Sequence, residues 1–428
     1  MRVSLRFLQP TLQQRCLKTL VVSGLLVAGA WAQTDGTILH NGTPSFPIGF
    51  YELPEDDAAL AEMASSGVNL IRCGSKEDLD RVQAVGAMGW MPLPLNQGPS
   101  DALKAQVESV KDHPALAVWE GPDEIVWNFT AYSGLFKSMG VYETKDEWWR
   151  QTPKAIAYSN AQAADIIPKM RDATAFIRSV DTRKLPVWIN EAQRSDVRFV
   201  RECLRFADIT GCDAYPITSK ERPAAHMGTT TQRWIETAKG KPVWMVMQGF
   251  SWDELGGDYV QNGNAYPSFA ESRLMAYDVI ARGGKGLLYW GSSYLKNGDF
   301  RRSLYDLTAE LAMLQPFLIA PNEESVKVHL VELEKERSGL GVFMTARRAG
   351  DDWLIILANE DSTPHMGVEV SGLAPLEGRD LMCLYSDETL RVTDGELIVR
   401  MQPLEVKVFA TSRGFETAQR DSRGYPGM

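Results

Sequence analysis

The chain has 428 residues, of which 44% are hydrophobic and 23% are charged, a composition typical of a globular protein. At roughly 150 residues per domain, this length allows more than one domain. The formal net charge of −10 argues against a nucleic-acid partner, because phosphate binding requires a basic surface.

The first 32 residues have the pattern of an export signal. Four basic residues stand within the first 18 positions, a largely apolar run without charge follows over residues 20–30, and Ala30-Trp31-Ala32 forms a small-x-small cleavage site. A membrane anchor is the alternative, but the run is shorter than the roughly 20 apolar residues that span a bilayer. We therefore expect the mature protein to begin at Gln33, to be secreted or periplasmic, and to be free of the membrane.

Residues 47 to about 320 alternate between short apolar runs and helical patterns such as Ile166, Met170, Ala173 and Ile177, which share one helix face. The apolar runs have the composition of strands buried on both faces. They are residues 47–52, 68–74, 88–95, 115–124, 185–191, 208–216, 241–250 and 286–294. Eight β-then-α units predict an α/β fold, a (β/α)8 TIM barrel over residues 33–321.

An open doubly wound sheet is the structural alternative to the barrel. Such a sheet would need a glycine-rich phosphate loop after its first strand. Residues 49–54 contain no such loop.

The pattern changes after Pro321 to short alternating runs that turn residues separate. These runs are residues 326–334, 340–346, 353–359, 367–370, 380–385, 390–392, 396–400 and 405–411. They predict a small antiparallel β-sandwich over residues 322–412. The polar, glycine-containing residues 413–428 are predicted to be a disordered tail.

The cysteines and histidines show no metal-ligand spacing, so neither a metal nor an organic cofactor is expected. Two interpretations of Cys203 and Cys212 stay open. They can pair as a disulfide in an oxidising compartment, or all the cysteines after the export signal can be buried free thiols.

In a (β/α)8 barrel the active site lies at the C-terminal ends of the strands. The polar and aromatic residues at the predicted strand ends, with two tryptophans from the loops that follow, include Tyr51, Arg72, Glu120, Asp123, Glu124, Trp127, Asn190, Glu191, Asp213, Tyr215, Gln248, Trp252 and Trp290. This set is rich in carboxylates and lacks histidine and lysine, which suits acid–base chemistry on a glycosidic bond. A lyase or an esterase is less compatible, because there is no G-x-S-x-G motif.

The longest connection, from about residue 125 to 160, carries many aromatic side chains, among them Trp127, Trp148 and Trp149. Long loops inside a barrel tend to be functional. We expect at least one of these rings to contact substrate, although packing within the loop is the alternative explanation.

The residues from His113-Pro114 through Glu120-Gly121-Pro122-Asp123-Glu124 resemble the fourth-strand segment of clan A glycoside hydrolases. In that family a strand after His-Pro ends in an acidic residue or Asn followed by the acid/base Glu, which corresponds to Glu124. Asn69-Leu70-Ile71-Arg72 resembles the second strand, whose arginine supports the catalytic carboxylate. The resemblance implies a glycoside hydrolase that acts on an oligo- or polysaccharide, with Glu124 as the proton donor and a C-terminal sandwich.

The chain departs from this family at the end of the seventh strand, where Gln248 replaces the nucleophilic Glu. An amide cannot form the glycosyl ester of a retaining mechanism. Three interpretations remain. In the first, Glu124 is the acid and Asp213 or Glu191 is the base or nucleophile, with inversion if the two carboxyls are about 6.5–9.5 Å apart. In the second, Asp123-Glu124 acts as in family 20 hexosaminidases, where the 2-acetamido group of the substrate is the nucleophile. In the third, the barrel binds glycan without cleaving it.

Overall fold

The computed structural model describes residues 35–131, 135, 139–256, 265–331 and 341–417. The predicted export signal and most of the predicted tail lie outside these ranges. Within the described ranges, no helix combines the length and the apolar character that a membrane crossing requires.

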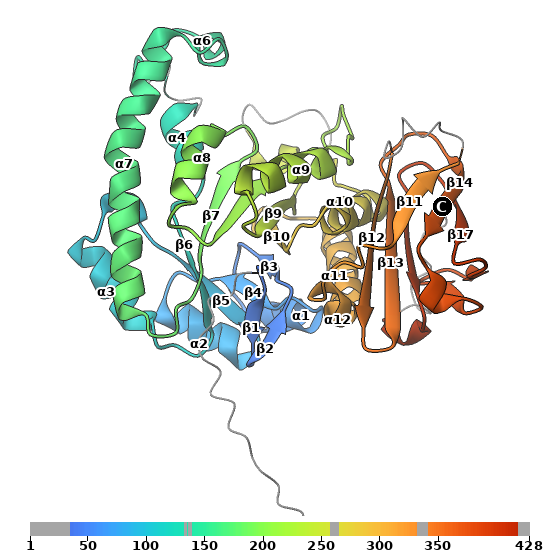
Figure 1. Cartoon of the computed structure of the whole chain (residues 1–428). Coiled ribbons are helices and arrows are strands. Elements are labelled where there is room, and N and C mark those ends of the chain that lie inside the picture. The colour runs from blue at the N-terminus through green and yellow to red at the C-terminus, as the bar shows by residue number, and fades with distance from the viewer. Residues whose placement is uncertain (1–34, 132–134, 136–138, 257–264, 332–340, 418–428) are drawn as a thin grey trace, which may run out of the picture. The chain divides into compact units, whose positions relative to one another are not determined.

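Eight parallel strands close into a barrel, as the alternation of apolar runs and helices predicts (Figure 1). In chain order they are β3 (Ile48–Phe50), β4 (Leu70–Arg72), β5 (Met88–Pro92), β6 (Leu116–Glu120), β7 (Val187–Ala192), β8 (Ile209–Asp213), β9 (Val243–Gln248) and β10 (Gly286–Trp290). The last strand pairs with the first, with Leu287 opposite Ile48, so the open-sheet alternative is excluded. The observed strands are shorter than the predicted runs because flanking apolar residues, such as Val68 and Phe250, are buried outside the strands.

Aromatic side chains fill the interior of the barrel. Trp90, Trp188 and Trp244 are fully buried, and successive ring centroids lie 5.8 and 5.5 Å apart. Tyr51 lies above them, with its ring centroid 5.3 Å from that of Trp90. Large side chains in layers are the usual filling of such a barrel, so these three tryptophans belong to the core rather than to a sugar site.

A short antiparallel hairpin, β1 (Ile38–His40) and β2 (Thr43–Ser45), precedes the first barrel strand. Ile38 is buried in the same cluster as the barrel tryptophans. The indole N–H of Trp244, near the start of β9, donates to the carbonyl oxygen of Gly36 at 2.9 Å. The hairpin therefore covers the end of the barrel at which the strands begin.

Helices follow most of the barrel strands. They are α1 (Asp57–Ser65), α2 (Lys76–Ala84), α3 (Asp101–Val110), α4 (Ile125–Thr130), α6 (Lys145–Trp149), α7 (Pro153–Val180), α8 (Val197–Cys203), α9 (His226–Ala238), α10 (Phe269–Ala281), α11 (Gly298–Met313) and α12 (Gln315–Leu318), together with the 3-10 turns η1 (Leu95–Gln97) and η2 (Trp252–Leu255). The helical stripe predicted from the sequence lies on α7, where Met170, Ala173 and Ile177 are buried.

The C-terminal residues form two antiparallel sheets, as predicted. One contains β11 (Lys327–Leu330), β14 (His365–Ser371) and β17 (Leu397–Met401); the other contains β12 (Val342–Ala349), β13 (Asp352–Asn359), β18 (Val406–Ala410), β15 (Asp380–Cys383) and β16 (Thr389–Arg391). Residues from both sheets, among them Val368, Val399, Ile355 and Phe409, share one core. That shared core makes the pair of sheets a β-sandwich.

Two details differ from the expectations or resolve them. The disordered tail was predicted to begin at residue 413, but Arg413–Phe415 forms a 3-10 turn, and the Phe415 ring packs against Phe317 at 4.8 Å. An apolar contact of this kind holds the segment, whereas residues 418–428 lie outside the described part of the chain.

Cys203 and Cys212 are both buried and free, so the disulfide interpretation is not supported.

Asn69 links the first two barrel strands, and its replacement tests that link. Its Oδ1 accepts from the Ile48 N–H at 2.9 Å, and its Nδ2 donates to the Phe46 carbonyl, which also accepts from Gln315. Asn69→Leu leaves the buried Ile48 N–H without a partner, so we expect the free energy of unfolding to fall by about 1–3 kcal/mol. Gln83→Leu, on the exposed side of α2, should change it by less than about 0.5 kcal/mol. Equal urea midpoints for the two variants would contradict this assignment.

Candidate active site

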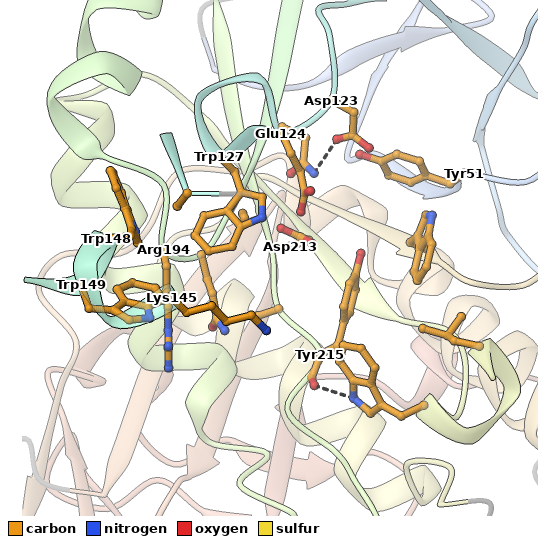
Figure 2. A pocket seen from close by; sticks show the side chains of 18 of the residues that line it. Tyr51, Asp123, Glu124, Trp127, Lys145, Trp148, Trp149, Arg194, Asp213 and Tyr215 are labelled. Carbon is orange, nitrogen blue, oxygen red and sulfur yellow. Dashed lines mark hydrogen bonds between the residues drawn. The ribbon is translucent and has the colours of Figure 1, made fainter. Parts of the chain in front are cut away.

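A cavity of about 790 Å³ lies at the C-terminal ends of the barrel strands (Figure 2). Its walls combine carboxylates, aromatic rings and two cationic side chains. The lining residues are Tyr51, Asp123, Glu124, Trp127, Ala131, Tyr142, Lys145, Trp148, Trp149, Asn190, Ala192, Gln193, Arg194, Asp213, Ala214, Tyr215, Trp252, Leu255, Trp290 and Tyr294. Nine residues of the predicted site set are therefore brought together, and Arg72, Glu120, Glu191 and Gln248 are not among the lining residues.

Glu124 is positioned by backbone contacts with the neighbouring strand. After β6 ends, the Gly121 N–H donates to the Trp188 carbonyl at 2.8 Å and the Glu124 N–H to the Asn190 carbonyl at 3.1 Å, so the chain continues beside β7. Glu124 has φ 49° and ψ 36°, the left-handed conformation that few residues other than glycine adopt. Strained backbone of this kind concentrates at functional sites.

Glu191, the reserve candidate for the second catalytic carboxylate, has a structural role instead. Its carboxylate accepts from the backbone N–H groups of Val126 and Trp127 and from the Ser195 hydroxyl, at 3.0, 3.3 and 2.7 Å. It thereby caps the first turn of α4, whereas the side chain of Glu124, at the N-cap position, makes no capping bond. Successive strand residues point to opposite faces, so Asn190 enters the cavity and Glu191 turns away from it.

Glu124 and Asp213 share a hydrogen bond between their carboxyl groups. Burial raises the pKa of Glu124, and the negative charge of Asp123 raises it further. Burial also raises the pKa of Asp213 well above its usual value, and the charges of Glu124 and Asp123 add to that effect. Two carboxyls in contact cannot both ionise readily, so the pair retains one proton beyond the usual pH range of a carboxylic acid.

Asp123 is the third carboxylate of the cavity. The Asn190 amide donates to its Oδ1 at 3.0 Å. Burial raises the pKa of Asp123, and both the Asn190 hydrogen bond and the charge of Arg72 oppose that rise. The Asn190 hydrogen bond and the charge of Arg72 therefore favour the ionised form of Asp123, beside the pair that shares a proton.

Arg72 and Glu120 form an ion pair that does not line the cavity. The Arg72 Nε donates to Glu120 Oε2 at 2.8 Å, and the Trp90 indole donates to the same oxygen at 3.1 Å. Burial raises the pKa of the fully buried Glu120 to about 7, against the opposing charge of Arg72. The Arg72 guanidinium also lies 5.5 Å from the ring centre of Tyr51, so the pair packs against a residue that lines the cavity.

Gln248, predicted to bind substrate, instead fastens the loop after β8. Its Oε1 accepts from the Ile217 N–H at 3.0 Å, and its Nε2 donates to the carbonyls of Ile217 and Phe250 at 2.8 and 3.1 Å. The side chain is 1% exposed. Its hydrogen-bonding groups are occupied by backbone partners, which explains why it is absent from the cavity wall.

Aromatic rings form much of the cavity wall. Tyr215 stacks on Trp290 with ring centroids 5.4 Å apart, and the Trp252 indole donates to the Tyr215 carbonyl at 3.2 Å. The long connection after β6 contributes Trp127 and Trp149, whose rings lie 6.3 Å apart. Rings of this connection therefore line the cavity, and the contact of at least one of them with substrate stays a prediction.

Sequence reasoning missed the cationic side of the cavity. Lys145 opens α6, and Arg194 follows the end of β7 by two residues. The strand-end rule could not include Lys145, because that residue lies in the middle of a long connection. Arg194 carried a weak signal, since it stands close to a strand end.

Several polar atoms of the cavity-lining residues are buried and have no hydrogen-bond partner among the described residues. They are the Tyr51 hydroxyl, Asn190 Oδ1 and Asp213 Oδ1. Buried polar groups in proteins are nearly always paired with protein or water, so these atoms are available to water or to a polar ligand in the cavity.

The contrast between Glu191 and Glu124 can be tested by the same truncation at both positions. Glu191→Ala removes three hydrogen bonds and leaves two backbone N–H groups of α4 unpaired, so we expect the free energy of unfolding to fall by about 2–4 kcal/mol. Glu124→Ala removes no cap and also removes one partly buried carboxyl, so it should cost less than about 1 kcal/mol. Urea unfolding measures both values, and a larger loss at Glu124 would reject the assignment.

No protein-family model matches the chain, and no curated protein resembles it in sequence. Solved structures do resemble it. A catalytic mutant of Gan42B, a GH42 β-galactosidase from G. stearothermophilus, is 11% identical with a TM-score of 0.52, over 86% of this chain and 98% of that one. The cold-adapted β-galactosidase from Rahnella sp. R3 is 10% identical with a TM-score of 0.51, over 88% and 100% of the two chains.

A β-galactosidase from the psychrophilic Marinomonas ef1 is also similar, at 12% identity and a TM-score of 0.43, over 63% of this chain. The chain spans 60% of the length of that protein. The likeness at these identities concerns the fold: the barrel with its C-terminal sheets is the fold of solved glycoside hydrolases.

Proposed function

We propose that the protein is a glycoside hydrolase in which Glu124 donates the proton that it shares with Asp213. The observation that carries the proposal is the hydrogen-bonded carboxyl pair in a cavity at the C-terminal ends of the barrel strands. Active sites of this fold lie at that end of the barrel. The glycoside hydrolase fold of the solved structures supports the same reaction class.

The shared proton suits the first step of glycoside cleavage. A glycosidic oxygen leaves readily only when it is protonated as its bond to the anomeric carbon breaks. The raised pKa values of Glu124 and Asp213 keep a proton on the pair to a higher pH than an ordinary carboxylic acid would, which favours general acid catalysis. After the leaving group departs, water adds to the anomeric carbon and returns a proton to the pair.

The contact between Glu124 and Asp213 changes the role expected for Asp213. An inverting enzyme keeps its two carboxyls about 6.5–9.5 Å apart to hold a water between them. Carboxyls joined by a hydrogen bond are closer than that, so we assign Asp213 to proton sharing rather than to water activation. Asp123 is then the carboxylate available to the anomeric centre, either directly or by orienting a 2-acetamido group.

The remaining cavity wall fits an oligo- or polysaccharide. The unpaired Tyr51 hydroxyl is a donor, and the unpaired oxygens of Asn190 and Asp213 suit hydroxyl groups of a sugar. The rings of Tyr215 and Trp290 offer apolar faces beside these polar atoms. Such a mixture of apolar surface and few placed polar groups is typical of a ligand site.

We also propose that the enzyme works outside the cytoplasm, in the periplasm or as a secreted protein. Support for this location comes from the charged, apolar and small-residue pattern of residues 1–32.

A non-catalytic glycan-binding protein is the second candidate. One observation favours it: at the end of β9, where clan A enzymes carry their nucleophile, Gln248 is committed to backbone partners. Nothing at that position can form a glycosyl ester.

A hydrolysis screen of the mature protein on a panel of neutral and acidic glycans distinguishes the two candidates. We expect cleavage by the wild type and a loss of at least roughly 100-fold in kcat/KM for Glu124→Gln and for Asp213→Asn, the scale of general acid catalysis. Glu236→Gln, which removes a carboxylate on the exposed part of α9, should retain wild-type activity.

Binding without cleavage on every glycan would reject the proposal in favour of the second candidate. Full activity in Asp213→Asn would leave Glu124 as the donor and remove the shared proton from the mechanism.

The pH profile tests the electrostatic coupling separately. Activity requires the proton of the pair, so it should fall as pH rises through the raised pKa of Glu124 and Asp213. Asp123→Asn removes a negative charge that raises both pKa values, so the descending limb of kcat/KM should move to lower pH in the residual activity. Asp101→Asn, on the exposed surface of α3, should leave the limb in place. A limb that moves to higher pH in Asp123→Asn would contradict the coupling.

A further inference from the structure

The cavity carries two cationic side chains that no described acidic group neutralises. Lys145 and Arg194 both line it, and neither side chain makes an ion pair or a hydrogen bond with a described residue. The acidic residues that line the same cavity are Asp123, Glu124 and Asp213. Figure 2 shows Arg194 beside Trp149, with the Lys145 side chain extending from there toward the middle of the cavity, and Asp123 beside Tyr51.

The packing of Arg194 holds its charge at the cavity wall. Its guanidinium carbon lies 5.4 Å from the ring centre of Trp149, and the Trp149 ring lies 6.3 Å from that of Trp127. An arginine stacked on an aromatic face keeps its N–H donors free at the edge of the guanidinium. The donors of Arg194 therefore remain available to a ligand that enters the cavity.

The overall charge of the chain does not explain why Lys145 and Arg194 line the cavity. The formal net charge is −10, so acidic groups outnumber cationic groups over the whole chain. Neutralisation of the three cavity carboxylates would place the cations against them, and Arg72 already opposes the raised pKa of Asp123 from outside the cavity. A neutral sugar can accept hydrogen bonds from these side chains, but it offers no charge to balance theirs.

We propose that Lys145 and Arg194 form a subsite for an anionic substituent, a carboxylate or a sulfate, on the saccharide that the cavity binds. This inference rests on the proposed function for the saccharide itself. The planar fork of Arg194 matches either oxyanion with two parallel hydrogen bonds, and Lys145 adds a mobile point charge. The three carboxylates repel the same substituent, so the acidic group is directed to the wall of Lys145 and Arg194 and the glycosidic bond to Glu124.

Binding to full-length mature Glu124→Gln protein, measured by calorimetry, tests the subsite without turnover. The probes are tetragalacturonate for the carboxylate, a carrageenan tetrasaccharide for the sulfate, and cellotetraose as the neutral control. At least one anionic probe should bind more tightly than cellotetraose, and Lys145→Gln or Arg194→Gln should each weaken that binding roughly 10-fold or more. Lys104→Gln, which removes the same charge from the exposed surface of α3, should leave it unchanged.

The result for each probe decides the source of the anion. Loss confined to tetragalacturonate assigns the subsite to uronic acids, and loss confined to the carrageenan fragment assigns it to sulfated sugars. Equal binding of the neutral and anionic probes, or unchanged binding in both variants, overturns the proposal. Circular dichroism of the variants confirms that the fold is retained.

The failure of this proposal differs from the failure of the proposed function. If the wild type cleaves a neutral glycan and rejects both anionic probes, the hydrolase assignment stands and the anionic subsite falls. If anionic binding depends on Lys145 and Arg194 but no glycan is cleaved, the subsite stands and the hydrolase assignment falls. Raised NaCl should weaken anionic binding and spare neutral binding, because salt screens the charges of these exposed side chains.

Discussion

The carboxylate of Glu191 makes the contact on which the arrangement of the site depends. By accepting from the first turn of α4 and from Ser195, it joins the end of β7 to the segment that follows β6. The same segment carries Glu124 in a left-handed conformation and Trp127 at the cavity wall. Glu191 does not line the cavity, but its carboxylate fixes the position of the segment that carries Glu124 and Trp127.

The pKa values of the three cavity carboxyls are raised by burial, and no cation forms a described ion pair with Asp123, Glu124 or Asp213. Burial raises the pKa of Glu124, of Asp213 and of Asp123, and the charge of Arg72, at the end of β4, opposes this effect for Asp123. Holding several carboxyls at reduced hydration lowers the stability of the free protein. Functional sites commonly have this property, since the groups are arranged for their reaction and not for the resting fold.

The barrel was predictable from the sequence because each strand is a buried apolar run and each connection has helical spacing, so local pattern and final fold agree. The floor of the site was predictable for the same reason: Tyr51, Asp213 and Tyr215 stand at or just past strand ends. The direction in which each side chain points could not be predicted. Glu191 and Asn190 are neighbours on one strand, and only the closed barrel shows which of the two faces inward. The place of Lys145 at the cavity could not be predicted from the sequence, because the position of its loop depends on tertiary packing.

The hydrogen bonds of Gln248 also limit how this barrel could change its chemistry. A glutamate in the same place would set its oxygens against the carbonyl oxygens of Ile217 and Phe250, which now receive N–H groups. Introducing the missing nucleophile by one substitution would therefore loosen the loop after β8, which leads on from Tyr215. A glutamate that serves as a nucleophile at this position would therefore require the loop after β8 to find other hydrogen-bond donors for those two carbonyl groups.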